Sequence, residues 1–292
     1  MLIRTALGKV IHQMKIMGYR ERTLNDYFLY VNQFADKMDL IYLTDISNEY
    51  ILNWLDTMNV SSQTKLTRLK CLKAFLSRCY DNGWYSIKFW SKVNIRIDNV
   101  VKIGASEQDV NSLIAKIDIS DFIGLRDTVA IMLMYQCGLR IRTLSLLEEK
   151  HIDLNNLLLR ISGDILKNRQ ELILPFDDYA ARLLRKLINR NREIRREHRE
   201  SNGYVIITSK GQCVIKGTNN AIQKRLTKYT KEFGLTNINP HALRRGFAVR
   251  LRKMGADIVL ISKALGHSDL AVTTKYLGVE KEEVANELRK YF

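Results

Sequence analysis

Proline is almost absent from this chain, with only Pro175 and Pro240 among its 292 residues. Proline interrupts helices because it lacks a backbone N–H and clashes with the preceding turn, so a chain that nearly lacks it can be helical over most of its length. Hydrophobic residues make up 46% of the sequence, enough to build buried cores. We therefore expect a mainly α-helical globular protein, long enough for two domains.

The N-terminal part of the chain has apolar residues at helical spacing and no strand pattern. The predicted helices span about 2–17, from 23 onward, about 49–58, and 62–80. The second helix is expected to bury the stripe Leu24, Phe28, Val31 and Phe34. The fourth is expected to bury Leu66, Leu69, Leu72 and Leu76, and to leave outside Lys65, Arg68, Lys70 and Lys73. We expect residues 1–91 to form an all-α domain.

Two interruptions of the helical pattern divide the remaining chain. Residues 92–105 lack periodicity and precede a helix-start signal at Ser106, which predicts a linker followed by a second domain over 106–292. Residues 157–176 alternate apolar and polar side chains around Gly163, which predicts a β-hairpin with Lys167 and Arg169 between its strands. The expected fold class is therefore mainly α with a small β-sheet, an α+β second domain after an all-α first domain.

The helix predicted at 179–200 ends in a densely basic stretch with interleaved glutamates. Such a mixture is typical of a solvated helix with internal ion pairs. We therefore expect no functional role for this helix beyond its contribution to the positive charge of the protein.

The last fifty residues bring together side chains that suit phosphate chemistry. Three short helices are predicted: one opening near Pro240, one stopped by Gly266, and one capped by Ser268 that carries Tyr276. Spacing i, i+3 places His241 and Arg244 on one face of the first of these helices. Arginine suits a phosphate site because its guanidinium is planar, bidentate and always charged.

An upstream arginine strengthens this interpretation. Gly138 closes a strongly apolar helix, so Arg140 is presented beside buried chain, where an unpaired charge is costly and an anionic partner is favoured. A lysine on the hairpin, Lys167, is suited to donate a proton to a leaving 5′-oxygen. Any one of these residues alone is explained as well by a helix start, a turn or packing. Their combination predicts a tyrosine that attacks phosphorus while fixed cations meet the developing charge.

With Arg140, Lys167, His241, Arg244, His267 and Tyr276 in this order, the chain resembles the tyrosine recombinase family, the phage-type integrases. The resemblance covers roughly 106–292 through Gly138-Leu139-Arg140, the H-x-L-R box at 241–244, the L-G-H box at 265–267 and Tyr276. One departure is Thr143, which occupies a position where the family commonly has an acidic residue. The chain looks closest to simple two-domain members, such as Xer-like resolution enzymes and integrases of compact mobile elements.

The resemblance implies a core-binding domain at 1–91, a catalytic domain at 106–292, and a mechanism. Tyr276 would attack the scissile phosphate and form a 3′-phosphotyrosine link, while Arg140 and Arg244 hold the non-bridging oxygens. His267 would add a hydrogen bond, His241 would assist proton removal from the tyrosine, and Lys167 would protonate the leaving oxygen. The implied assembly is a homo-tetramer on two DNA sites, with accessory DNA-binding proteins as possible partners. No cofactor is implied.

Charge and cysteine usage fit a protein that acts on DNA. The net charge of +16 favours a nucleic-acid partner, because no apolar run is long enough for a membrane span and no signal peptide is visible. Lys65, Arg68, Lys70, Lys73 and Arg169 are the candidate DNA contacts. The four cysteines lack C-x-x-C spacing, which predicts neither a metal site nor disulfides, and a reducing, cytoplasmic compartment.

Two other functions remain open from the sequence. A type IB topoisomerase shares this chemistry and relaxes DNA as a monomer, and a non-catalytic regulator could retain the same fold. After Tyr276, apolar residues recur every four positions at Val284, Leu288 and Phe292. This stripe could pack on a neighbouring subunit or on its own domain.

Overall fold

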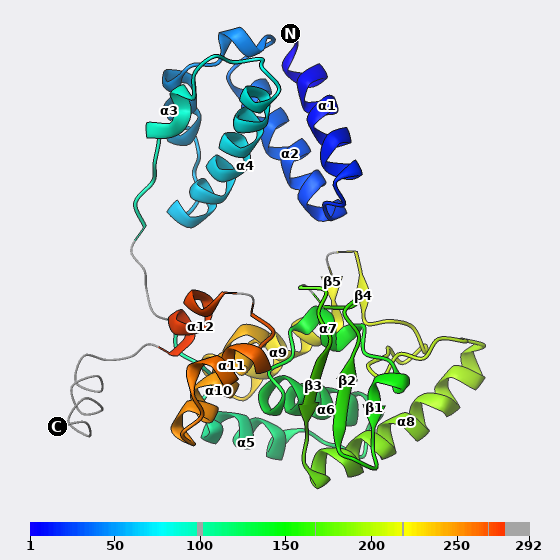
Figure 1. Ribbon diagram of the computed structural model, residues 1–292. Helices are drawn as coiled ribbons and strands as arrows, with labels where there is room; N and C mark the ends of the chain where they lie inside the picture. Colours follow the sequence, from blue (N-terminus) through cyan, green and yellow to red (C-terminus); the bar gives the residue numbers. More distant parts are fainter. Residues whose placement is uncertain (98–101, 167, 218, 268, 278–292) are drawn as a thin grey trace, which may run out of the picture. The chain divides into compact units, whose positions relative to one another are not determined.

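The computed structural model describes residues 1–97, 102–166, 168–217, 219–267 and 269–277, and its chain divides into two compact units, Met1–Asn99 and Val100–Phe292. The first unit is all-helical, and the second combines helices with two small antiparallel sheets (Figure 1). The expected fold class, mainly α with a small β-sheet, is confirmed.

The four predicted N-terminal helices are all present. They are α1 (Ile3–Ile16), α2 (Glu21–Lys37), α3 (Asn48–Asp56) and α4 (Ser62–Asp81), with short 3-10 turns η1 (Leu43–Asp45) and η2 (Phe89–Lys92). Ser47 and Ser61 cap α3 and α4 by accepting backbone N–H groups of the first turn. Aromatic side chains pack in the core of this unit: the Phe34 and Trp54 rings meet edge to face, with 5.2 Å between their centroids.

The predicted apolar stripe of α2 is wrong at one position. Phe28 is 58% exposed, whereas its neighbour Tyr27 is buried beside Leu24, Val31 and Phe34. Adjacent helical positions point about 100° apart, so only one of the two rings can face α1 and α4. The spacing of apolar residues allowed either ring, and tertiary packing selects the tyrosine.

The buried face of α4 differs in detail from the prediction. Leu69, Leu72 and Leu76 are buried as expected, but Leu66 is only half-buried. Lys73 does not stay outside: its Nζ donates to the carbonyls of Ser91 at 3.1 Å and Val93 at 2.9 Å, and burial lowers the pKa of this ammonium. Lys73 therefore holds the segment after η2 against α4.

The second unit is built around one central helix. Its elements are α5 (Glu107–Lys116), α6 (Phe122–Gln136), α7 (Ile141–Ser145), η3 (Glu149–His151), β1 (Ile152–Asp153), β2 (Leu158–Ile161), β3 (Leu172–Pro175), α8 (Asp178–His198), β4 (Ile215–Lys216), β5 (Asn219–Asn220), α9 (Ala221–Glu232), α10 (Pro240–Lys253), α11 (Ile258–Ala264) and α12 (Leu270–Leu277). From Gly124 to Tyr135, α6 is buried on every side, and it packs against α8, α9 and α10.

The predicted hairpin is present and gains a third strand. Strands β2 and β3 pair antiparallel, with Leu159 opposite Leu174 and Ile161 opposite Leu172. Leu159 and Ile161 are buried while Arg160 is exposed, which is the expected alternation. The unpredicted strand β1 adds to the other edge of β2. Its two residues are too few to produce an alternating pattern in the sequence.

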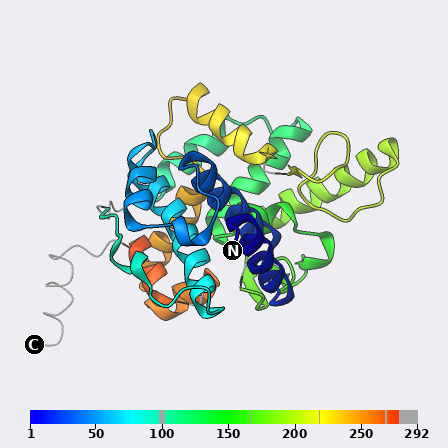
Figure 2. The ribbon, with the colours of Figure 1, turned by 90° about the horizontal axis from the view of Figure 1, so that it is seen from above.

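Helix α8 is tied to the rest of its unit more firmly than predicted. Arg190 and Glu193 form the expected internal ion pair at 2.6 Å. Arg195, however, is buried and bonds Glu149 of η3 at 2.8 Å, an ion pair outside the helix that the sequence did not predict. The C-terminal half of α8 forms one end of this unit, and α10, α11 and α12 gather at the other (Figures 1 and 2).

Residues 103–105 run along α10 in close contact. The Ala105 N–H donates to the Ala242 carbonyl at 2.8 Å, and Arg245 Nε donates to the Ile103 carbonyl at 3.1 Å. A Cβ on Gly104 would lie 2.7 Å from the Gly246 nitrogen, and one on Gly246 would lie 2.5 Å from the Ala105 carbonyl oxygen. Only glycine at both positions admits this approach of backbone to backbone.

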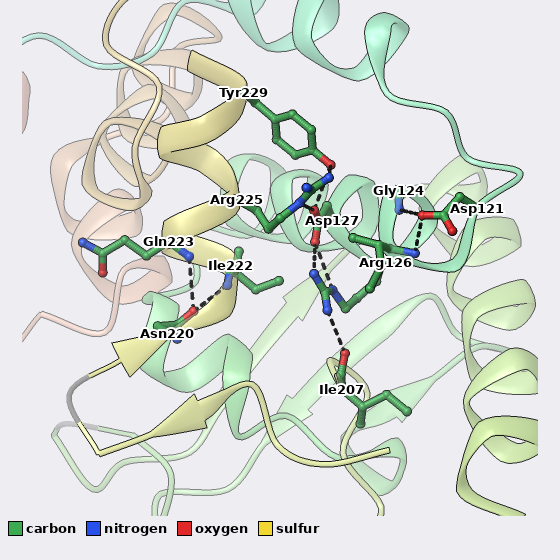
Figure 3. A network of polar contacts seen from close by, with 11 residues as sticks. Asp121, Gly124, Arg126, Asp127, Ile207, Asn220, Ile222, Gln223, Arg225 and Tyr229 are labelled. Carbon is green, nitrogen blue, oxygen red and sulfur yellow. Dashed lines mark hydrogen bonds and ion pairs between the residues drawn. The ribbon is translucent and has the colours of Figure 1, made fainter. Parts of the chain in front are cut away.

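A buried ionic network joins α6 to α9 (Figure 3). One oxygen of Asp127 accepts from Arg126 Nε and Nη2 at 3.0 and 2.6 Å, and the other accepts from Arg225 Nε at 2.8 Å and from the Tyr229 hydroxyl at 2.9 Å. Arg126 also donates to the Ile207 carbonyl at 3.1 Å. Burial, reinforced by the Asp127 charge, raises the pKa of Tyr229 to about 12. Asp127 is thus the counter-anion of two arginines.

We expect Asp127→Ala to lower the free energy of unfolding of the second unit by about 3–5 kcal/mol, because Arg126 would remain buried without its counter-charge. Urea denaturation of the full chain measures this loss. Asp121→Ala is the matched control on the same helix: Asp121 only caps the Ile123 and Gly124 N–H groups, so its loss should cost about 0.5–2 kcal/mol. Equal losses for the two variants would contradict an ionic role for Asp127.

Candidate active site

The loop after α6 presents the first of the six candidate residues. Gly138 has a φ of +62°, and a Cβ there would run into the Phe247 ring, so glycine is needed for this turn. Arg140 follows as the N-cap of α7, half-buried, and its Nη1 donates to the Leu265 carbonyl at 3.4 Å. The turn thus directs the first arginine toward the L-G-H segment.

Helix α10 carries His241 and Arg244 as predicted. Pro240 occupies its first turn, and the Asn239 side chain caps it by accepting from the Ala242 N–H at 2.9 Å. Arg244 is buried and donates to two backbone carbonyls, those of Gly138 and Leu265. Its Nη2 also lies 3.1 Å from His267 Nε2. His241 lies at the start of the same helix, with part of its ring exposed and part covered.

The environment of His241 favours its neutral form. Partial burial of the ring, together with the charges of Arg245, Arg244, Lys102 and Arg140, lowers its pKa. A neutral imidazole can accept a proton at neutral pH, so His241 has the protonation state that the sequence interpretation requires of it.

Both arginines donate hydrogen bonds to the turn between α11 and α12. Gly266 ends the helical run with a φ of +58°, which confirms the predicted stop. The carbonyl of the preceding Leu265 accepts from Arg140 and from Arg244, and His267 Nδ1 lies 2.8 Å from the Thr273 hydroxyl of α12. The side-chain nitrogen of Asn168 lies 3.5 Å from the place that a Cβ on Gly266 would occupy. The connection between β2 and β3 therefore passes beside this turn.

Other candidate residues differ in how far the structure describes them. The backbone of Tyr276 lies in α12, but its side chain is not described. Lys167, Ser268 and the tail residues Val284, Leu288 and Phe292 lie outside the described residues. Arg169 is exposed in the β2–β3 connection, with a φ of +58°. The structure therefore places Arg140, Arg244 and His267 around one turn, with His241 three residues before Arg244 on α10.

Thr143, at the position where an acidic residue is common, is buried in α7. Arg140 is held by a backbone carbonyl, that of Leu265. Sequence reasoning missed this group and the Gly138 carbonyl, because backbone oxygens have no signature in a sequence. It also missed Thr273, whose signal was its position three residues before Tyr276.

The arrangement suits binding of an anion. Two guanidinium groups converge beside an imidazole, and such fixed donors stabilise negative charge that develops during a reaction. Among the residues that the structure describes, no group of three or more His, Cys, Asp or Glu side chains is placed to hold a metal ion. Within the same residues, no helix has the length and apolar character needed to cross a bilayer.

Comparison with known proteins agrees with this geometry. The sequence is 28% identical to the tyrosine recombinase XerC of Chlamydia caviae, over 82% of this chain and 74% of that protein, and 26% identical to XerC of Thermodesulfovibrio yellowstonii, over 88% and 83%. The fold resembles that of the Tn1549 transposon integrase, solved in complex with transposon right end DNA, with a TM-score of 0.81, 15% identity and coverage of 100% and 99%. The model of the phage integrase family matches residues 105–283, well over half of the sequence, and on that match the chain belongs to this family.

Proposed function

We propose that this protein recombines DNA at specific sites by cleaving each strand with Tyr276 and rejoining it through a 3′-phosphotyrosine intermediate. The observation that carries the proposal is the convergence of Arg140 and Arg244 on the Leu265 carbonyl, at the turn that leads into the helix of Tyr276. The covalent link conserves the energy of the broken phosphodiester bond, so religation needs no high-energy cofactor.

Each side chain has a role that its surroundings support. Arg140 and Arg244 hold the non-bridging oxygens of the scissile phosphate, and His267 lies beside this pair, within 3.1 Å of Arg244. His241, neutral because its pKa is lowered, assists removal of the tyrosine proton. Lys167 protonates the leaving 5′-oxygen, a role that rests on its place in the hairpin sequence.

The class of activity follows from family membership: the chain is a tyrosine recombinase, an enzyme that breaks and rejoins DNA strands. We further propose that it works as a homo-tetramer on two duplex sites, inside the cell, with or without accessory proteins. The XerC relatives and the DNA-bound transposon integrase support duplex DNA as its substrate. Integration, excision and resolution are all compatible with this chemistry.

We assign DNA backbone binding to the N-terminal domain, proposed as residues 1–91 with a linker at 92–105 and the catalytic domain at 106–292. On α4, Lys70 is exposed, and the half-buried Arg68 places its guanidinium over the Tyr30 ring, 5.6 Å from the ring centroid. Lys65 and Arg169 complete the proposed contacts. Lys73, which bonds carbonyls of its own unit, contributes through its charge alone.

A cleavage assay in excess EDTA tests the mechanism. The substrate is a nicked duplex that carries a recombination site, sought as inverted repeats by sequencing the DNA beside the gene. We expect the covalent protein–DNA adduct to form at an unchanged rate, because arginines neutralise the phosphate. Loss of the adduct in EDTA and its return with magnesium would refute this chemistry.

The same preparation separates the proposed function from its two rivals. A recombinase exchanges strands between two copies of the site, whereas a type IB topoisomerase relaxes a supercoiled plasmid that lacks the site. A non-catalytic regulator would bind the duplex and form no adduct. We expect strand exchange that depends on the paired site.

A further inference from the structure

A buried hydroxyl on α12 makes a contact to the candidate site that the proposed mechanism does not use. Thr273 is fully buried, and its Oγ1 lies 2.8 Å from His267 Nδ1. The other ring nitrogen, Nε2, lies 3.1 Å from Arg244 Nη2. His267 is therefore held at both nitrogens, between the helix of Tyr276 and the arginine of the H-x-L-R box.

The chemistry of the two contacts determines where the ring proton lies. A guanidinium only donates hydrogen bonds, so Nε2 must accept from Arg244 and carries no proton. A neutral imidazole with an unprotonated Nε2 has its proton on Nδ1, which then donates to the Thr273 hydroxyl. The hydroxyl can accept this bond whatever the orientation of its own hydrogen. The Arg244 contact thus selects the Nδ1–H tautomer of His267, and the Thr273 hydroxyl, which accepts from that proton, holds the ring in this orientation.

The consequence extends to Arg244. Its guanidinium is held from three directions, by the Gly138 carbonyl, the Leu265 carbonyl and His267 Nε2. Only the third of these acceptors sits on a side chain that can rotate, and Thr273 restrains that rotation. Outer partners that fix the orientation and tautomer of a functional histidine commonly have such a role.

We infer that Thr273 is a positioning residue: its hydroxyl fixes the ring of His267 and thereby aligns α12, which carries Tyr276 one turn later, with Arg244. The inference rests on the proposed function for the assignment of Tyr276 and Arg244 to the reaction. Its structural part, the protonation of His267 on Nδ1, can be tested without any reaction.

The first test observes the ring itself. In the full-length protein labelled with ¹⁵N-histidine, two-bond ¹H–¹⁵N correlations distinguish a proton on Nδ1 from one on Nε2, and the signal of His267 is assigned by its loss in His267→Gln. We expect the Nδ1–H form in the wild-type protein and in Thr273→Ser. In Thr273→Val we expect a changed Nδ1 chemical shift, because the proton on Nδ1 has lost its hydrogen-bond acceptor. A wild-type spectrum with the proton on Nε2 overturns the inference, and so does an unchanged spectrum in Thr273→Val.

The second test measures cleavage of the nicked duplex described above. Thr273→Val keeps the side-chain shape and removes the hydroxyl, so adduct formation should slow by roughly 10- to 100-fold, the usual cost of losing such an outer partner. Thr273→Ser should recover most of that loss, with binding to the duplex unchanged in both variants. Equal rates for the valine and serine variants, or a wild-type rate for Thr273→Val, would overturn the inference.

Thr274→Val is the matched control on the same helix. The Thr274 side chain is exposed, and its hydroxyl bonds only the Leu270 carbonyl one turn back, at 3.0 Å. This variant should leave both the spectrum and the rate unchanged. If the wild-type protein and all variants form no adduct while the spectra change as expected, the proposed function fails and the positioning contact stands. If Thr273→Val does not fold, the wild-type spectrum still tests the inference, because a proton on Nε2 of His267 would overturn it.

Discussion

Tyr276→Phe should abolish the covalent protein–DNA adduct while leaving binding to the recombination site nearly intact. The change removes one oxygen, the proposed nucleophile, and it alters no charge that contributes to phosphate binding. A denaturing gel of the nicked duplex measures the adduct, and gel retardation of the intact duplex measures binding. The expected result is complete loss of the first signal and an unchanged second one.

Persistence of the adduct in Tyr276→Phe would move the nucleophile elsewhere. Tyr291 is the next tyrosine in the sequence, so Tyr291→Phe serves as the matched control and should cleave at the wild-type rate. The opposite pattern, with loss in Tyr291→Phe alone, would assign the attack to Tyr291. Weakened binding in Tyr276→Phe would indicate that the ring contributes to docking as well as to chemistry.

Lys167→Ala should slow cleavage by roughly 10²- to 10⁴-fold, the contribution expected of a positioned proton donor. The rate of adduct formation on the nicked duplex measures this loss. A second substrate, with sulfur in place of the 5′-bridging oxygen, distinguishes proton donation from other roles. A thiolate leaves without protonation, so Lys167→Ala should recover most of the wild-type rate on that substrate.

Arg169→Ala is the control for the position of the lysine in the hairpin. Arg169 lies exposed in the same connection between β2 and β3, two residues further on, so its removal should give no rescue by sulfur. Rescue of Arg169→Ala in place of Lys167→Ala would mean that the arginine is the proton donor. Absence of rescue in both would place the general acid outside this connection.

The helices and the hairpin were predicted well because one face of each element is buried. Burial of one face makes apolar residues recur in the sequence at the period of a helix or of a strand. In β2 the alternation of Leu159, Arg160 and Ile161 is the burial pattern observed. The stripe of α2 failed at Phe28 because two adjacent rings satisfied the same period, and only the shapes of α1 and α4 decide between them. The local sequence pattern thus predicts whether a segment is a helix or a strand more firmly than which of its side chains face the core.

The sequence allowed us to propose the side chains of the candidate site, but it gave no sign of the groups that hold them. Gly138 and Gly266 were visible as helix stops, and both have the positive φ that such a stop requires. What holds Arg140 and Arg244, however, is largely backbone: the Leu265 carbonyl serves both arginines. Every residue carries such an oxygen, so only the fold shows which one is used. The partner of Asp127 across the unit, Arg225, was equally invisible, because the two residues lie far apart in sequence.

The contact of residues 103–105 with α10 determines where the second unit can be cut free of the first. A shortened chain that begins at Ser106, the N-cap of α5, would lose the Ile103 carbonyl that Arg245 bonds and the Ala105 N–H that bonds the Ala242 carbonyl. It would also expose Gly246 to water, because residue 105 packs against that glycine. The helix exposed in this way is the one that carries His241 and Arg244. A chain that begins at Lys102 keeps the whole contact. The first helix of a domain and the first residue of its folding unit are therefore different positions in this protein.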